Sequence, residues 1–183
     1  IITWTGLNET SQVQADPSQH TRLHIDIYEL TRMLDPTRPA HDSSGYVHAK
    51  TDLWTVHNYT QDPVEFEKAI ARTQDGPFRN HPEWEPEYSG QPYLVDEFGG
   101  IKWIPPGTTP YLNSSWGYGD APKTIEEFYD RLDGQVKVLR NRDDICGWCY
   151  TQLTDVEQEQ NGIYQFDRSE KFDMERIRKI LIQ

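Results

Sequence analysis

The chain has little positive charge and few cysteines. Lysine and arginine total 18 of its 183 residues against 30 aspartates and glutamates, a formal net charge of −12. This deficit argues against a nucleic-acid partner, whose affinity comes mainly from neutralised phosphates, and against an anionic membrane surface. No run approaches the roughly 18 consecutive apolar residues of a membrane span. With no initiator Met and no recognisable signal peptide, we expect a piece of a longer polypeptide, whose localisation the sequence leaves open.

The two cysteines, Cys146 and Cys149, lie in the run 145–153, which predicts a strand. Residues three apart on a strand point to opposite faces, so we expect two buried free thiols rather than a disulfide, a redox motif or a zinc site. His20 and His24 are one helical turn apart but lack the glutamate of a metalloprotease helix, and we expect them on a solvated face. The sequence therefore predicts neither a metal nor a cofactor.

Strands and helices alternate along the chain, in about four βα units. We expect strands over 1–9, near residue 40, and over 52–59, 92–97 and 145–153, with helices over 17–34, 63–72, 125–139 and 174–181. Leu23, Ile27, Leu30 and Leu34 form an apolar stripe on the first helix. The capping-box pattern Thr124-Ile125-Glu126-Glu127 opens the helix at 125–139, whose expected buried stripe is Ile125, Phe128, Leu132, Val136 and Leu139. The pattern predicts a single α/β domain with parallel strands and outer helices.

Two glutamates close predicted strands: Glu9 ends the first strand and Glu97 ends the strand at 92–97. In a barrel of parallel strands the C-terminal strand ends meet at one mouth, where the chemistry takes place. Two carboxylates there suit glycoside hydrolysis, one as acid and one as nucleophile. A plainer interpretation is that each acid caps the next helix. Long loops rich in tryptophan and tyrosine follow Glu97 and Leu153, and such loops favour the active-site interpretation.

Five motifs together resemble glycoside hydrolase family 2, which includes β-galactosidases, β-glucuronidases and β-mannosidases. They are Trp4-x-x-x-Asn8-Glu9, Thr37-Arg38-Pro39, His57-Asn58-Tyr59, Asp96-Glu97-Phe98-Gly99-Gly100 and the segment 149–164. The resemblance implies that residues 1–183 are the C-terminal half of a catalytic (β/α)8 TIM barrel. It also implies a carbohydrate substrate, most closely a β-galactoside, and as partners the N-terminal half of the barrel, accessory β-sandwich domains and a possible homo-oligomer. We expect the isolated piece to be inactive.

By motif matching, the resemblance makes Glu9 the general acid/base and Glu97 the nucleophile of a retaining hydrolase. It places Asn8 at the sugar 2-hydroxyl and Tyr59 beside the nucleophile. Further substrate-binding candidates, for which packing within the protein is the alternative, are His57, Trp103, Trp116, Trp148 and Asn161. Tyr150-Thr151-Gln152 stands where the best-known members carry a tryptophan, and an Asn-x-Lys glucuronate signature is not seen, so the sugar stays open.

Three alternatives keep the same residues but change the function. A carbohydrate-binding or scaffold domain would need the aromatic residues without the two glutamates. An inverting hydrolase would hold its carboxyl groups about 6.5–9.5 Å apart rather than about 5–5.5 Å. β-Glucuronidase or β-mannosidase specificity would need only a different pocket on the same fold. Asp155, Glu157 and Glu159 are expected to form a solvated acidic loop rather than a metal cluster.

Overall fold

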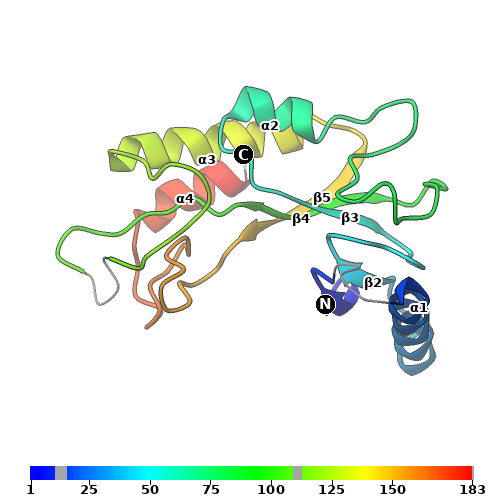
Figure 1. The fold of residues 1–183 in the computed structure, drawn as a ribbon. Helices are drawn as coiled ribbons and strands as arrows, with labels where there is room; N and C mark the ends of the chain where they lie inside the picture. The colour runs from blue at the N-terminus through cyan, green and yellow to red at the C-terminus, as the bar shows by residue number, and fades with distance from the viewer. Residues whose placement is uncertain (11–15, 109–112, 183) are drawn as a thin grey trace. The chain divides into compact units, whose positions relative to one another are not determined.

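The computed structural model describes residues 1–10, 16–108 and 113–182, in which strands and helices alternate as predicted. The elements are β1 (Trp4–Asn8), α1 (Pro17–Leu34), β2 (Ala40–Ser44), β3 (Trp54–Asn58), α2 (Pro63–Ala69), β4 (Tyr93–Gly99), α3 (Ile125–Arg140), β5 (Ile145–Thr151) and α4 (Met174–Ile182) (Figure 1). Among the helices described, none combines the length and apolar character needed to cross a membrane.

The chain divides into two compact units. The first contains the described residues of Ile1–His57, Ile70–Glu97 and Asp144–Trp148, and the second those of Asn58–Ala69, Phe98–Asp143 and Cys149–Gln183. The strands form a two-stranded sheet, β1-β2, and a three-stranded sheet in the order β3-β4-β5. The expected α/β class is therefore confirmed.

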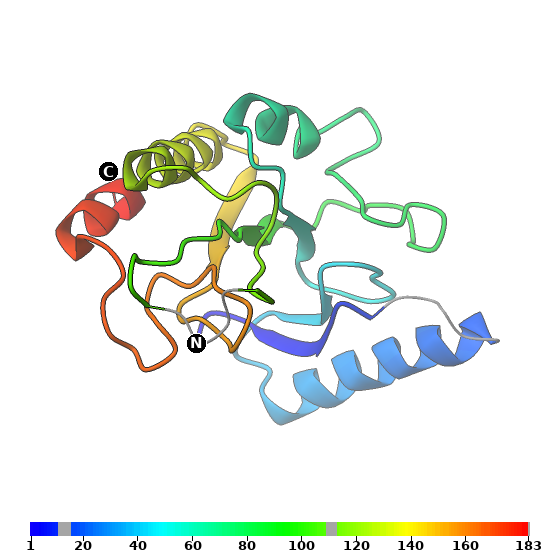
Figure 2. The same ribbon diagram turned by 60° about the vertical axis from the view of Figure 1, so that its left-hand side comes forward.

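In the first unit, β1 and β2 are parallel, with Trp4 opposite Ala40 and Asn8 opposite Ser44. Helix α1 runs alongside this pair of strands (Figures 1 and 2). Asp16 caps its N-terminus by accepting a hydrogen bond from the backbone N–H of Ser18, and Pro17 follows at the first helical turn. Both are frequent choices at a helix start, which explains why the sequence located this boundary correctly.

The face that α1 buries differs from the prediction. His20 and His24 are its buried residues, whereas Leu23 is 48% and Leu34 76% exposed. The prediction of solvated histidines was therefore wrong. The physical reason lies on β2, where the carboxylate of Asp42 is fully buried and needs hydrogen-bond donors from the helix packed against it.

Asp42 is the centre of a buried polar network. Its carboxylate accepts hydrogen bonds from His48 Nδ1 at 2.8 Å, from His24 Nδ1 at 3.2 Å and from the backbone N–H groups of Ser43, Ala49 and Lys50. Burial alone would raise the pKa of Asp42, but the hydrogen bonds from His24 and His48 hold it well below its usual range. Apolar leucines could not satisfy this carboxylate, and so the histidine face of α1 turns inward.

Side chains connect β2 to β3, where the two sheets meet in the first unit. Thr55 Oγ1 donates to the carbonyl oxygen of Ser43 at 3.2 Å and accepts from the backbone N–H of Gly45 at 3.0 Å. Together with His48, 3.1 Å from the carbonyl oxygen of Thr55, these contacts take the place of ladder hydrogen bonds. They hold the C-terminal end of β2 against β3, and this end carries the residues of the candidate site.

In the second unit, α3 packs against both α2 and α4. Its buried stripe contains Phe128, Leu132, Val136 and Leu139, as the periodicity predicted. Thr124 caps the helix through the backbone N–H of Glu127, which confirms the capping motif. Gly134 lets α2 approach closely, because a Cβ there would lie 2.5 Å from Cγ of Pro63.

Two further expectations need correction. Cys146 and Cys149 are free thiols, but both are exposed rather than buried, because β5 is the outer strand of its sheet. In the loop after β5, Asp155 is only 4% exposed and lies 2.8 Å from the buried Lys171 Nζ, whereas Glu157 is exposed. The loop is thus tied to the second unit by a buried ion pair.

Candidate active site

Glu9 directly follows β1, and its backbone N–H donates to the carbonyl oxygen of Ser44 at 3.0 Å. Its φ of 49° lies in the left-handed region, which non-glycine residues rarely adopt. Tyr46, just beyond β2, has a φ of 56°. Strained residues of this kind concentrate at functional sites, where the surrounding structure holds them in place.

Glu97 lies within β4, two residues before the strand ends, and its side chain is 23% exposed. His57, at the C-terminal end of β3, stands between the two glutamates. A carboxylate oxygen of Glu9, a ring nitrogen of His57 and a carboxylate oxygen of Glu97 all lie within 4.8 Å of one another. One carboxylate oxygen of each glutamate therefore lies within 4.8 Å of the other, although β4 continues for two residues beyond Glu97, where the sequence predicted the strand to end.

His57 is the most connected side chain of this site, although it is only 3% exposed. Its Nδ1 lies 2.6 Å from Glu9 Oε1, and its Nε2 lies 2.9 Å from Ser44 Oγ. The same Nε2 is 3.5 Å from one oxygen of Asp96 and 3.5 Å from one oxygen of Glu97. Protein groups thus surround both ring nitrogens of His57.

Burial by itself lowers the pKa of His57. The hydrogen bonding and charge of Asp96, followed by the charge of Glu97 and the contact with Glu9, outweigh burial and raise the pKa above its ordinary value. Tyr46, whose ring lies edge-on to the imidazole at 6.4 Å, also has a raised pKa, caused first by the charge of Glu9, then by burial and then by the charge of Glu97. The site is therefore a cluster of carboxylates, Glu9, Asp96 and Glu97, around the imidazole of His57.

A metal ion is a second possible use of the same residues. Two carboxylates and an imidazole suit a divalent transition metal, and among the residues the structure describes these three form the group whose ligand atoms come close enough. The hydrogen bonds of His57 to Glu9 and Ser44 already account for the position of its ring. The geometry therefore requires no metal.

The other predicted site residues are distributed over both units. In the first unit, Asn8 is exposed at the end of β1 and Trp148 is half-buried on β5. In the second unit, the ring of Tyr59 stacks on Tyr118 with a centroid distance of 3.5 Å, and the Tyr59 hydroxyl donates to Thr151 Oγ1 at 3.4 Å. Their roles toward a substrate remain predictions.

The remaining candidates lie in the loops of the second unit. Trp116 is 41% exposed and lies edge-on to Tyr118, and Trp103 is half-buried. Asn161 is fully buried, with its amide shared between Glu159 Oε1 at 3.0 Å and Gln152 Nε2 at 2.9 Å. These contacts give Asn161 a role in holding its own loop.

Sequence reasoning missed three residues of this site: Ser44, Tyr46 and Asp96. Ser44 ends β2 and donates its hydroxyl hydrogen to Asp96 Oδ2 at 2.6 Å. Asp96 is the neighbour of Glu97 on β4, and because neighbours on a strand usually point to opposite faces, its place beside Glu97 did not indicate that it contacts His57. The position of Ser44 at the end of β2 is only a weak signal, because serines are common at strand ends without a functional role.

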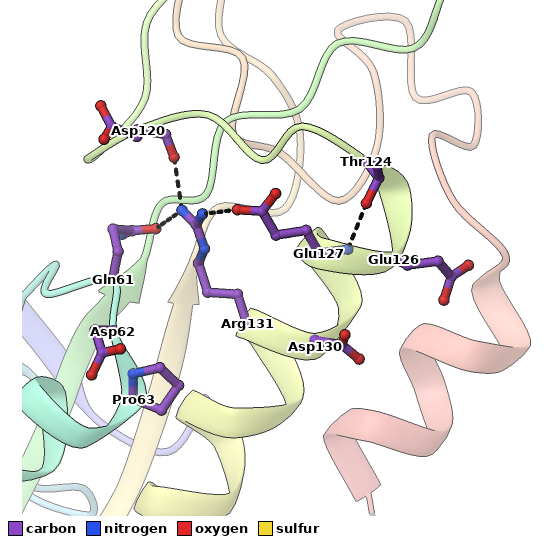
Figure 3. Close-up of a pocket in the computed structure, with 9 residues that line it drawn as sticks. All are labelled: Gln61, Asp62, Pro63, Asp120, Thr124, Glu126, Glu127, Asp130 and Arg131. Carbon is purple, nitrogen blue, oxygen red and sulfur yellow. Dashed lines mark hydrogen bonds and ion pairs between the residues drawn. The ribbon is translucent and has the colours of Figure 1, made fainter.

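A hollow of about 640 Å³ lies in the second unit at the N-terminus of α3. Figure 3 shows Arg131 at its centre, bonded to Gln61, to the backbone carbonyl of Asp120 and to Glu127. Five carboxylates line it: Asp62, Asp120, Glu126, Glu127 and Asp130. Arg131 is bonded to Gln61, Asp120 and Glu127, and the backbone of Glu127 belongs to the cap of α3. These bonds tie a loop to the helix, and the residues that line the hollow do not pair a nucleophile with a base.

Comparison with known proteins places the fold. No protein-family model matches the sequence, and no curated protein is detectably similar to it. Solved structures do match. A family 2 β-galacturonidase from Eisenbergiella tayi superposes with a TM-score of 0.64 at 19% identity, over 98% of this chain and 32% of that chain. A β-D-glucuronidase from Dictyoglomus thermophilum gives a TM-score of 0.62 at 19% identity, over 100% of this chain and 32% of that one.

A third structure, Bacteroides uniformis β-glucuronidase 2 covalently bound to cyclophellitol-6-carboxylate aziridine, matches with a TM-score of 0.60 at 17% identity, over 93% of this chain and 22% of that chain. The chain thus spans a third or less of the length of these structures. At such identities the likeness concerns the fold alone. The fold of this chain resembles that of part of the glycoside hydrolase family 2 enzymes.

Proposed function

We propose that this chain is the C-terminal part of the catalytic barrel of a longer protein, and that this protein hydrolyses a terminal β-glycosidic bond with retention. Glu9 is the general acid/base and Glu97 the nucleophile. The observation that carries the proposal is that the two glutamates approach each other around His57, with one carboxylate oxygen of each and a ring nitrogen of His57 all within 4.8 Å of one another. The resemblance to family 2 structures supports it from the fold.

The reaction follows from the positions of the two carboxylates. One oxygen of Glu97 attacks the anomeric carbon while Glu9 gives its proton to the departing glycosidic oxygen. The resulting ester joins the sugar to Glu97. Glu9, now ionised, then takes a proton from a water molecule whose oxygen attacks the same carbon and releases Glu97. An inverting enzyme needs room for this water between its carboxyl groups from the start, which the spacing here does not favour.

Two sugar classes are candidates. The three carboxylates around His57, with Asp96 beside Glu97, give the site an anionic character that favours an uncharged sugar such as a β-galactoside. The solved structures favour a uronide, because their names are those of a β-galacturonidase and β-glucuronidases. We propose the β-galactoside first and the uronide as the second candidate.

A panel of nitrophenyl β-glycosides separates these candidates when it is tested on the full-length protein. We expect turnover of the galactoside to exceed that of the glucuronide, the galacturonide and the mannoside. Preference for a uronide would select the second candidate. Binding of sugars without turnover of any glycoside would select a carbohydrate-binding or scaffold function.

Covalent labelling tests the nucleophile. Incubation of the full-length protein with the 2-fluoro analogue of the preferred glycoside should label Glu97, because the fluorine slows hydrolysis of the ester. Peptide mass spectra identify the labelled residue. A label on Glu9, or no label in an enzyme that turns over the parent glycoside, would contradict the assignment.

A further inference from the structure

His57 was predicted to bind substrate, but protein groups occupy its ring. Its contacts come from three parts of the first unit: Glu9 after β1, Ser44 at the end of β2, and Asp96 with Glu97 on β4. The imidazole is therefore an internal member of the site.

The hydrogen bonds around His57 define where its protons lie. The Ser44 hydroxyl has one hydrogen, which it donates to Asp96 Oδ2 at 2.6 Å, because an ionised carboxylate can only accept. Ser44 Oγ must then accept the Nε2–H of His57. On the other side, an ionised Glu9 at 2.6 Å can only accept from Nδ1–H. His57 consequently carries both ring protons and a positive charge when Glu9 and Asp96 are ionised.

The backbone around His57 holds its ring in place. Gly45 has a φ of +59°, and a Cβ there would lie 2.5 Å from Cδ2 and 2.7 Å from Nδ1 of His57. The backbone of Gly45 therefore packs directly on the ring, with Tyr46 at its edge. A ring held this firmly can fix the direction of the Glu9 carboxylate.

We propose that His57 is a positioning residue for the hydrolysis: as an imidazolium it holds Oε1 of Glu9, which leaves Oε2 to exchange the proton with the substrate, and its charge keeps Glu97 ionised. The inference rests on the proposed function. His57 keeps both of its protons throughout, and the proton that reaches the leaving oxygen comes from Oε2 of Glu9. The same oxygen later takes a proton from water.

The charge balance explains why the site needs this cation. Three carboxylates, Glu9, Asp96 and Glu97, surround one imidazole. Without a positive charge among them, mutual repulsion would favour their protonated forms, and a protonated Glu97 cannot attack. The raised pKa of His57 agrees with a charged ring.

Titratable groups face His57 from the strands β1, β2 and β4 and the residues that follow them. They are Glu9 after β1, His41 on β2, Tyr46 after β2, and Asp96 and Glu97 on β4. Burial lowers the pKa of His41, so this second imidazole is neutral where His57 is charged. His57 is therefore the charged imidazole of this cluster.

The test compares two isosteric variants of the full-length protein. In His57→Asn the amide nitrogen takes the place of Nδ1 and can still donate to Glu9, but without charge. In His57→Gln the amide reaches the place of Nε2 and loses Glu9. We expect kcat of His57→Asn to fall roughly 10–100-fold with little change in KM. Both limbs of its pH profile should move to higher pH, because loss of a neighbouring positive charge disfavours ionised carboxylates.

We expect His57→Gln to lose more activity on glycosides with poor leaving groups than on activated ones, because only Glu9 is left unheld. His81→Asn is the matched control, since His81 is also a histidine of the first unit but its carboxylate neighbour is Glu83, at 3.9 Å, rather than Glu9 or Glu97. A rise in KM with unchanged kcat and an unshifted pH profile would overturn the positioning role and make His57 a substrate contact.

A measurement on the free protein separates this inference from the proposed function. With 15N-labelled histidine, the ring nitrogens of His57, assigned by their loss in His57→Asn, should report an imidazolium at pH 7. Glu97→Gln should lower the midpoint of its titration. A neutral His57 ring at pH 7 would overturn the inference even in an active hydrolase, whereas a charged ring in a protein that cleaves no glycoside would overturn the proposed function alone.

Discussion

At the scale of single residues, Glu9 has a role that depends on the leaving group. Glu9→Ala removes the proton donor, so we expect loss of roughly 10²–10⁴-fold on alkyl glycosides and a much smaller loss in formation of the glycosyl-enzyme from activated aryl glycosides. Added azide should partly restore turnover of the aryl glycosides, because it attacks the ester without needing a base. Glu87→Ala, an exposed glutamate of the first unit, is the control. Equal losses on both substrate types would mean that Glu9 is not the acid/base.

Gly45 offers a second prediction at this scale. Gly45→Ala would place a Cβ 2.5 Å from the His57 ring, whereas Gly90→Ala meets nothing within 4 Å although Gly90 also has a positive φ of +98°. Both variants carry the backbone cost of about 1–2 kcal/mol. We expect only Gly45→Ala to lose roughly 100-fold in kcat/KM, because it displaces the imidazole. Thermal unfolding and kinetics of the two variants provide the measurement, and equal activities would show that the ring tolerates the methyl group.

These residues also show how far the sequence could predict the site. Glu9 and Glu97 were found because each follows a short apolar run, and parallel strands bring such positions together. Ser44 on β2 and Asp96 on β4 contact His57 on β3 and each other. How these strands are aligned with one another depends on the folded structure and cannot be read from the local sequence. A serine at a strand end carries too little local signal to indicate that partnership.

At the scale of elements, α1 is held to β2 by the buried carboxylate of Asp42. Asp42→Asn keeps the shape but removes the charge that faces His24 and His48, and an uncompensated buried charge costs roughly 3–5 kcal/mol. Urea unfolding should detect this loss. Asp26→Asn, on the exposed side of α1, should change the free energy of unfolding by less than about 0.5 kcal/mol. A similar small change for Asp42→Asn would mean that the network contributes little.

The pH dependence of this network has a definite sign. The lowered pKa of Asp42 gives stability that is present above the ordinary aspartate value and is lost as the pH falls through the lowered one. For His48, burial lowers the pKa, but the hydrogen bond and charge of Asp42 outweigh it and raise the pKa. The stability that charged His48 contributes is present below about pH 6.5 and is lost as the pH rises through its raised pKa. We expect the difference between wild type and Asp42→Asn to be largest between about pH 4 and 6.5.

For helix α1, the sequence predicted the boundaries correctly but not the face that is buried. Its boundaries were correct, because Asp16, Pro17 and the final Asp35-Pro36 are local signals. Its inward face was wrong, because the leucine stripe could not reveal that a buried aspartate lies on the adjacent strand. The residues that helix α3 buries include Phe128, Leu132, Val136 and Leu139, and there the apolar stripe identified the core correctly.

At the scale of the whole molecule, we predict that this 183-residue chain, when produced by itself, is catalytically silent and associates in solution. β1 and β5 are outer strands of their sheets, and unpaired strand edges recruit other strands. Apolar side chains lie exposed beside β1 and along α1, with Ile2 at 82% and Leu34 at 76% exposure. Burying them against a second copy removes this surface from water.

Sedimentation velocity at micromolar concentration should therefore detect a dimer or larger species. Ile2→Lys and Leu34→Lys should shift the equilibrium toward monomer, whereas Phe166→Lys, a change at an equally exposed side chain in the second unit, should not. We expect no activity because catalytic side chains must be held within about 0.5 Å of their productive positions by the residues around them. The chain spans a third or less of the solved structures it resembles, so part of that support is missing from it. A stable monomer would refute the association, and hydrolysis of an aryl β-glycoside by the purified chain would refute the silence.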